Sequence, residues 1–304
     1  MRINRILFLV LVWAVVSCAC DYIVLPEEED TSKADASKDW SAVVTSISQT
    51  GAGDLHVDLA IRNETGDWST MLAAVDKPAV LSVGGKTTNC DTVFVSSGGH
   101  RLAPGFQMRG FVTGTKADPK IQLLYVECKG VQAAPGARLS IDYAYFTGEY
   151  NYYEQQANKK NAVMVVDLDQ IASDLQYPIA EPVQDLIQAS DVEIIAINNC
   201  TLILTEITRS EKGLQFKWVN SNPGEYPTYV HIGLPPVIGA DGIIYGFYES
   251  PDIASVPVTG AGKTAEWTTE VAVPPEVKGL YILLSVESKK QRLFTNYAID
   301  ISDR

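Results

Sequence analysis

The chain has few of the residues that usually carry catalysis or bind metals. Its 304 residues include three histidines (His56, His100 and His231) and five cysteines, none of them in a CxxC pair. Structural zinc is normally held by clusters of Cys and His, so we expect no metal site and no cofactor. A Gly-x-Ser-x-Gly elbow and a His-Glu-x-x-His motif are also missing. These absences favour a protein that is not an enzyme, although a Ser-His-Asp triad assembled from distant segments stays open.

Basic residues are scarce relative to acidic ones. The chain has 24 Lys and Arg against 37 Asp and Glu, which gives a formal net charge of −13. Nucleic-acid binding needs a basic surface, so we expect no nucleic-acid partner. Adhesion to anionic lipid through charge alone is excluded for the same reason. The simplest role of this charge is to keep the protein well solvated.

No apolar run in the chain reaches the roughly 20 residues that span a bilayer. The longest such run, residues 6–16, follows the basic residues Arg2 and Arg5 and precedes the small residue Ser17. A basic start, an apolar stretch of this length and a small residue are typical of a secretory signal. We therefore expect a signal peptide at 1–17. An uncleaved membrane anchor and an ordinary secreted protein cut nearby are the alternatives.

Residues 15–18, Val-Val-Ser-Cys, complete this segment. They resemble the lipobox of bacterial lipoproteins. The resemblance implies that Cys18 is lipidated and that the protein is extracytoplasmic, lipid-anchored to a bacterial membrane. Several acyl chains on one cysteine would hold the protein firmly, because a single chain binds only marginally. Residues 18–39 are charged and small, which predicts a lipidated acidic tether without a packed core.

From residue 40 onward, apolar and polar residues alternate as they do in β-strands. Leu55, Val57, Leu59 and Ile61 are each separated by one residue, and a turn-forming stretch precedes and follows them. Further β-type runs follow with Gly and Pro between them, at 79–83, 92–96, 106–112, 121–128 and 138–146. Strands at this spacing predict a β-sandwich or barrel.

The same order of signals returns in the second half of the chain. A strand-like run at 202–208, a turn at 210–213 and an alternating run at 214–218 end at Asn222, as the earlier series ends at Asn63. Near the end, residues 292–298 match residues 138–144. We interpret these matches as two copies of one fold, forming separate sandwiches at 40–148 and 192–304. Between them, the apolar spacing of residues 168–175 predicts one short helix, and Pro182 followed by Val183, Leu186 and Ile187 predicts a second, both within a connector at 149–191.

Several turns and returning strands carry a family resemblance. The stretches are Gly-Ala-Asp-Gly at 239–242 leading into residues 243–245, residues 267–273 followed by Pro274 and Pro275, and Ala-Pro-Gly-Phe at 103–106. They resemble the immunoglobulin-like domains of bacterial surface lipoproteins. The resemblance implies an all-β fold: two immunoglobulin-like β-sandwich domains in tandem, with a short α-helical connector. The resemblance also implies a location on the bacterial surface, and it assigns no catalytic residues to this chain.

Two cysteines fall in the same predicted domain. Cys90 and Cys128 are candidates for a disulfide in an oxidising compartment, and two buried free thiols are the alternative. Cys200 lies in an apolar run and is expected to be a small core residue.

Two further motifs suggest chemistry. Residues 257–264 and 84–87 partly match a phosphate-binding loop, but each lacks its first glycine, and a strand-like run follows residue 264, so we expect β turns. Asp241, Glu249 and Asp252 could act as paired carboxylates in a glycosidase. Because Asp-Gly is a common turn, a plain turn is the stronger interpretation of Asp241.

The expected function is therefore one of binding. Tyr226, Tyr229 and Tyr248 form the possible binding surface, since outward aromatic side chains on a sandwich suit a sugar ring or a protein partner. We expect a non-enzymatic, envelope-anchored lipoprotein that acts as a binding or structural module. Its partners would be the membrane, through the lipid anchor, and another envelope protein or a glycan. An extracytoplasmic carboxylate-type hydrolase and an accessory subunit of a membrane transport or secretion assembly are the alternatives.

Overall fold

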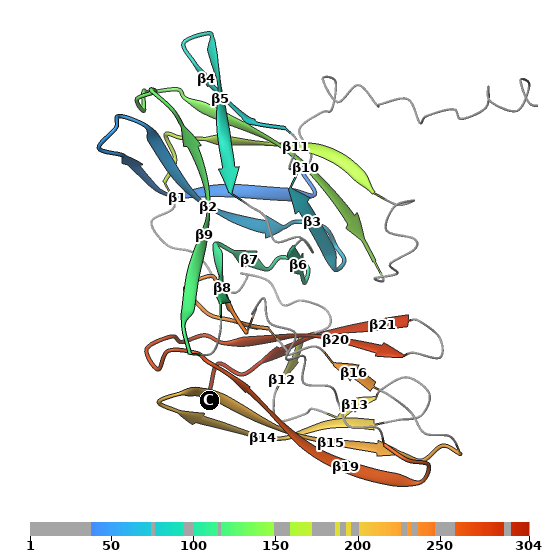
Figure 1. Cartoon of the computed structure of the whole chain (residues 1–304). Helices are drawn as coiled ribbons and strands as arrows, with labels where there is room; N and C mark the ends of the chain where they lie inside the picture. The colour runs from blue at the N-terminus through green and yellow to red at the C-terminus, as the bar shows by residue number, and fades with distance from the viewer. Residues whose placement is uncertain are drawn as a thin grey trace, which may run out of the picture. The chain divides into compact units, whose positions relative to one another are not determined.

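A computed structural model describes residues 38–73, 77–93, 100–114, 117–148, 159–171, 186–188, 193–195, 201–225, 230–232, 236–246, 259–288 and 293–303. Within these residues the chain is all-β and contains no helix (Figure 1), as expected. It follows that the described part contains no helix able to cross a membrane.

The first half contains two facing sheets. In one, β2 (Leu55–Asn63) lies between β1 (Trp40–Gln49) and β9 (Pro119–Cys128), with all pairs antiparallel. In the other, β10 (Arg138–Thr147) lies between β3 (Ser69–Ala73) and β11 (Lys160–Asp167). The alternating side chains of β2 and β10 point inward and belong to one apolar core, which makes this half a β-sandwich.

The second half repeats these pairings. Here β15 (Gly213–Asn222) lies between β14 (Thr201–Ser210) and β19 (Lys263–Val271). Likewise β20 (Tyr281–Ser288) lies between β16 (Val230–Ile232) and β21 (Leu293–Asp300). The described chain also contains β4 (Ala79–Val83), β5 (Lys86–Val93), β6 (His100–Leu102), β7 (Gln107–Met108), β8 (Gly110–Gly114), β12 (Leu186–Gln188), β13 (Glu193–Ile195), β17 (Val237–Ile238) and β18 (Ile243–Tyr245).

A β-bulge at the same place in both halves strengthens this correspondence. The β1–β2 register shifts between Val44 and Ser46, directly after the pair Val44–Leu59. The β14–β15 register shifts between Leu204 and Glu206, directly after the pair Leu204–Trp218. A bulge adds one residue to one strand and is a designed feature of a fold rather than a defect. The two hairpins therefore share an irregularity that period-two alternation alone would not produce.

A buried asparagine ends the second strand of each hairpin. The Asn63 amide donates to the carbonyl oxygen of Leu102, 2.9 Å away, and its side-chain oxygen accepts from the Thr65 N–H at 2.9 Å. Asn222 likewise donates to the carbonyl oxygen of Thr259 at 3.0 Å and accepts from the Gly224 N–H at 3.0 Å. Each asparagine thus closes a local turn and ties it to a distant loop.

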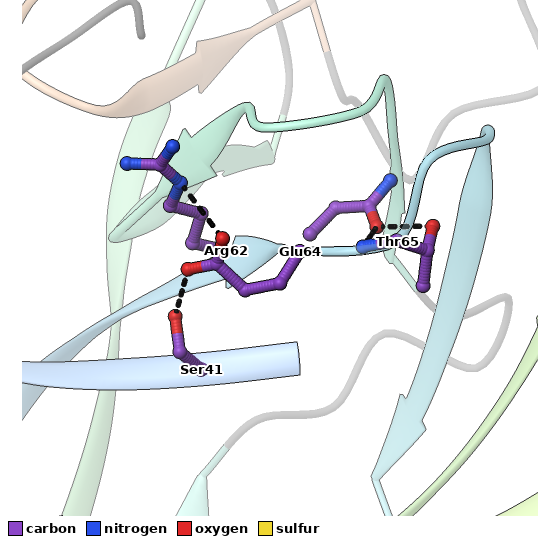
Figure 2. Close-up of polar contacts among 5 residues, drawn as sticks. Ser41, Arg62, Glu64 and Thr65 are labelled. Carbon is purple, nitrogen blue, oxygen red and sulfur yellow. Dashed lines mark hydrogen bonds and ion pairs between the residues drawn. The ribbon is translucent and has the colours of Figure 1, made fainter. Parts of the chain in front are cut away.

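An exposed polar cluster lies beside the Asn63 turn. Figure 2 shows Glu64 paired with the Arg62 Nε at 3.4 Å and accepting from the Ser41 hydroxyl at 2.6 Å, with Thr65 next in the turn. Because these side chains are partly solvated, the cluster contributes little to stability.

The sequence match between residues 138–144 and 292–298 does not pair equivalent strands. β10 is the central strand of its sheet, flanked by β3 and β11. Its counterpart in the second half is β20, flanked by β16 and β21. β21 instead corresponds to β11, so this part of the predicted correspondence is wrong. Half-buried strands of similar length share the same alternation of apolar and polar residues. A strand in one half can therefore be matched by mistake to the strand next to its true counterpart in the other half.

The helical connector is wrong where the structure describes it. Residues 168–171 form a turn and an isolated bridge from Ile171 to Val44. Leu186 and Ile187, expected in the second helix, belong to β12, which pairs in parallel with β21. A helix this short gains few internal hydrogen bonds, whereas a strand edge offers the backbone immediate partners. The rest of the connector lies outside the described residues.

Main-chain pairing joins the two halves. The first part of β9 pairs with β8, and β8 pairs in parallel with β18 of the second half. Gly110 permits this approach, since a Cβ there would lie 2.6 Å from the Gln122 carbonyl oxygen and 2.9 Å from Ile243 Cδ1. Residues 35–304 accordingly form one compact unit. The domain limits 40–148 and 192–304 stay a prediction.

The expected disulfide is confirmed. Cys90 in the middle of β5 and Cys128 at the end of β9 are bonded, with an S–S distance of 2.02 Å. Both residues are buried. β5 also pairs with β9 beside the bond, from Asp91 opposite Glu127 to Val93 opposite Tyr125. The covalent link therefore fastens a strand pair that the backbone already makes.

Candidate binding pocket

Most residues singled out from the sequence for binding lie outside the described part of the chain. These residues are Cys18, Tyr226, Tyr229 and Tyr248, together with the carboxylates Glu249 and Asp252 and the core candidate Cys200. Among the described residues, no three His, Cys, Asp or Glu side chains gather in a way that could hold a metal ion.

One described histidine does meet a serine and an aspartate, but in the wrong order for catalysis. The Ser46 hydroxyl donates to Asp58 Oδ2 at 2.8 Å, and His56 Nε2 lies 3.0 Å from Asp58 Oδ1. In a catalytic triad the histidine stands between the serine and the carboxylate, so that it can take the serine proton. Here the carboxylate stands between them. This cluster therefore lacks a histidine positioned to take the proton of Ser46.

The remaining chemical candidates are structural. Asp241 Oδ1 accepts from the Ile243 N–H at 3.1 Å, and its Oδ2 accepts from the Tyr245 hydroxyl at 2.6 Å. Both oxygens are thus engaged in the turn before β18, as expected for a plain Asp-Gly turn. The partial phosphate-loop motif is also a turn, in which Lys263 N–H donates to the Gly260 carbonyl as β19 begins. The motif at 84–87 is the β4–β5 hairpin turn.

An apolar pocket of about 270 Å³ lies where β8, β9 and β18 meet the β14–β15 turn and the segment after β19. Its lining combines residues from both halves of the chain. Val112, Tyr245 and Val273 are buried, whereas Ile121 is 58% exposed. The complete lining is Val112, Pro119, Ile121, Glu211, Lys212, Tyr245, Ala272, Val273 and Pro274.

Arg209 holds the segment that forms one wall. Its Nη2 donates to the carbonyl oxygens of Pro274 at 2.9 Å, Pro275 at 3.2 Å and Val277 at 2.8 Å. The Val277 N–H also donates to the Pro274 carbonyl at 3.1 Å. Hydrogen bonds from a charged guanidinium are among the stronger ones in proteins. The wall at Pro274 is therefore fixed without depending on a ligand.

The β14–β15 turn is held against the same wall by a glycine. Gly213 has a φ of +138°, and a Cβ at this position would lie 2.1 Å from the Val271 carbonyl oxygen. No other residue fits there without moving the backbone. Gly213 therefore keeps Glu211 and Lys212 beside the end of β19, where they line the pocket.

Tyr245 contributes its ring to the lining while its hydroxyl is engaged elsewhere. Burial raises the pKa of the Tyr245 phenol far above its ordinary value, and the hydrogen bond to Asp241 raises it further. The side chain therefore stays neutral at any physiological pH. The pocket is thus lined by uncharged surface except for Glu211 and Lys212, which belong to an exposed turn.

The sequence pattern does not predict this pocket. It places Gly213 in a turn and Pro274 after a strand-like run, and it places Tyr245 in the residues that follow the Asp-Gly turn. Nothing local indicated that β8 and β9 would meet these segments, because the meeting depends on the β8–β18 pairing.

Comparisons with known proteins do not place the chain in a family. No family model matches it, and no curated protein resembles it in sequence. Among solved structures, a red sea bream transglutaminase is 9% identical with a TM-score of 0.21, over 86% of this chain and 31% of that one. This chain thus spans about a third of that protein.

Two other solved structures have similar scores. A Salmonella enterica SafA pilin in complex with the SafB chaperone is 8% identical with a TM-score of 0.16, over 86% of this chain and 96% of that one. The Pseudomonas aeruginosa CupB2 chaperone is 10% identical with a TM-score of 0.16, over 80% and 91%. These scores are low, so the description of the fold rests on the strand pairings alone.

Proposed function

We propose that the protein is a non-enzymatic binding module built from two immunoglobulin-like β-sandwiches. The sheets β1–β2–β9 and β14–β15–β19 have the order of strands A, B and E in an immunoglobulin-like domain, and β3–β10–β11 and β16–β20–β21 have that of C, F and G. The shared bulge and the two buried asparagines support the duplication.

The observation that carries the binding function is the preformed apolar pocket. Its walls are fixed by Arg209 and Gly213, and its lining is apolar apart from Tyr245, Glu211 and Lys212. A concave apolar site with few polar groups is the usual form of a binding site. Ser46, His56 and Asp241 are engaged in arrangements that suit structure better than catalysis.

Site-specific photocrosslinking in intact cells tests this function. A photoreactive amino acid would replace Ile121 at the pocket, and in a control chain it would replace Val165 on β11, which is similarly exposed at 50%. We expect a defined adduct from position 121 and none of that mass from position 165. Equal adducts at both positions, or none at 121, would count against binding at the pocket.

We further propose that the module is extracytoplasmic and held to a bacterial membrane by lipid on Cys18. The support is the residue pattern at 15–18, with residues 18–39 acting as the spacer. Metabolic labelling with an alkyne fatty acid tests this point. Cys18→Ser should abolish the label and release the protein from membranes, whereas Cys20→Ser should change neither. Persistent labelling of the Cys18→Ser chain would contradict the anchor.

A further inference from the structure

We propose that the pocket binds a single neutral aromatic ring system. This inference rests on the proposed binding function and names the class of ligand. It follows from the size, the polarity and the rigidity of the pocket.

The volume of the pocket suits a ligand of one or two rings. The pocket has a volume of about 270 Å³. A cavity of roughly 150 Å³ lined by apolar side chains is known to hold a benzene molecule. The pocket is thus large enough for a bicyclic ring, and its volume lies below the roughly 300–1,000 Å³ of the pockets that hold drug-sized ligands.

Polarity disfavours sugars and ions. Val112, Ile121, Val273 and the prolines offer no hydrogen-bonding side chain, and the Tyr245 hydroxyl is already bonded to Asp241. A sugar would bury hydroxyl groups without partners, which is costly. Glu211 and Lys212 line the pocket with one charge of each sign, so neither an anion nor a cation is favoured.

Rigidity favours a ring over a flexible chain. Pro119 and Pro274 have fixed backbone angles, and Arg209 bonds three carbonyl oxygens behind the Pro274 wall. A flat ring has no internal rotations to lose when it enters a pocket with such rigid walls, whereas an alkyl chain loses several and pays for them in conformational entropy. The Tyr245 ring adds an aromatic surface that another ring can contact edge-to-face or in an offset stack.

The test is a titration followed by methyl NMR on the whole chain in lipid nanodiscs. The probes are indole, 1-hexanol, which is about as hydrophobic as indole, and glucose. We expect indole to shift the methyl signals of Val112, Ile121 and Val273 in a saturable way and to leave Val165 unchanged. Indole should bind at least five times more tightly than 1-hexanol, and glucose should not bind.

Two variants at the rim and one control complete the experiment. Ile121→Trp should fill the mouth and weaken indole binding at least tenfold, whereas Ile121→Ala should retain it. Val165→Trp, an equally large change outside the pocket, should have no effect. Because Ile121 and Val165 are exposed, these changes should leave the fold intact, which circular dichroism would verify.

The outcomes separate the two proposals. If 1-hexanol or glucose binds as tightly as indole, the aromatic ligand class is overturned while the binding function stands. If no probe gives saturable shifts but crosslinking succeeds at position 121, the ligand class again fails alone. If neither titration nor crosslinking shows binding, the proposed function fails as well.

Discussion

The two halves share a strand order but differ in the side chains that their central strands bury. The inward side chains of β2 include Leu55, Val57, Leu59 and Ile61, and all are aliphatic and fully buried. At the same ladder positions β15 carries Leu214, Phe216, Trp218 and Asn220. The inward side chains of β2 are therefore all aliphatic, whereas those of β15 combine large rings with a buried amide.

The strands at the outer positions differ as well. In the first half, β9 is paired with β2 on one side and β5 on the other, and the disulfide Cys90–Cys128 locks the β5 side. In the second half, β19 is paired with β15, and no second strand flanks it among the described residues. The same strand order thus occurs with different neighbours for the outer strand. This is possible because pairing with the central strand already fixes the register of the outer strand.

Removing the largest buried ring of the second core should have the largest effect. Trp218 stacks on Trp267 with ring centroids 5.5 Å apart, and its Nε1 donates to the Thr269 hydroxyl at 2.9 Å. Trp218→Ala should lower the free energy of unfolding by about 3–5 kcal/mol. Urea unfolding measures this, with Leu59→Ala at the matching ladder position for comparison. A loss under 1 kcal/mol for Trp218→Ala would contradict the packing described for this core.

Loss of the disulfide should come next and act on the first half. Its partners are 38 residues apart. The chain-entropy model then gives a stabilisation of about 4 kcal/mol before any strain. Replacing both Cys90 and Cys128 by Ala should lower the urea midpoint, and adding reductant to this variant should have no further effect. An unchanged midpoint would show that the β5–β9 pairing suffices by itself.

The two asparagines give the most direct test of the duplication. Asn63→Ala and Asn222→Ala each remove hydrogen bonds to a buried carbonyl oxygen and to a turn N–H. Each should cost about 1–3 kcal/mol, because a buried polar group is left without its partner. Similar losses in thermal unfolding would support equivalent roles. A large loss at one position with none at the other would argue against them.

Alkaline pH should destabilise the second half through its buried tyrosines. The pKa values of Tyr245, Tyr281 and Tyr297 are raised, mainly by burial. Above about pH 10 the unfolded phenols lose protons that the folded ones keep, so the free energy of unfolding falls as pH rises. The slope is at most about 1.4 kcal/mol per pH unit for each tyrosine.

Tyr245→Phe isolates one contribution to this slope. The variant should lose less stability than the parent between pH 9 and pH 11, as measured by urea unfolding at each pH. Its stability near neutral pH should fall by about 1 kcal/mol, because the hydrogen bond to Asp241 is gone. An identical slope in the two proteins would mean that Tyr245 ionises normally.

Local patterns were sufficient wherever neighbours in sequence decide the structure. The alternation around Leu55 predicted β2, Asp-Gly at 241–242 predicted a turn, and the turn at 84–87 was recognised despite its likeness to a phosphate-binding loop. They failed at Leu186, where an apolar spacing compatible with a helix gave way to pairing with β21. The slip that matched β10 to β21 has a similar cause, since alternation identifies a strand without identifying its neighbours.

The amino-acid sequence by itself determined that the described sheets are β-structure, where their central hairpins turn, and which cysteines could bond. These features depend on side-chain period and turn chemistry within a few residues. Only the tertiary structure decided that β8 meets β18 and that Ile121, Tyr245 and Pro274 line one pocket. The physical reason is that backbone hydrogen bonds between strands are nearly the same for every residue type. The pairing of strands that are distant in sequence therefore depends on how whole sheets pack.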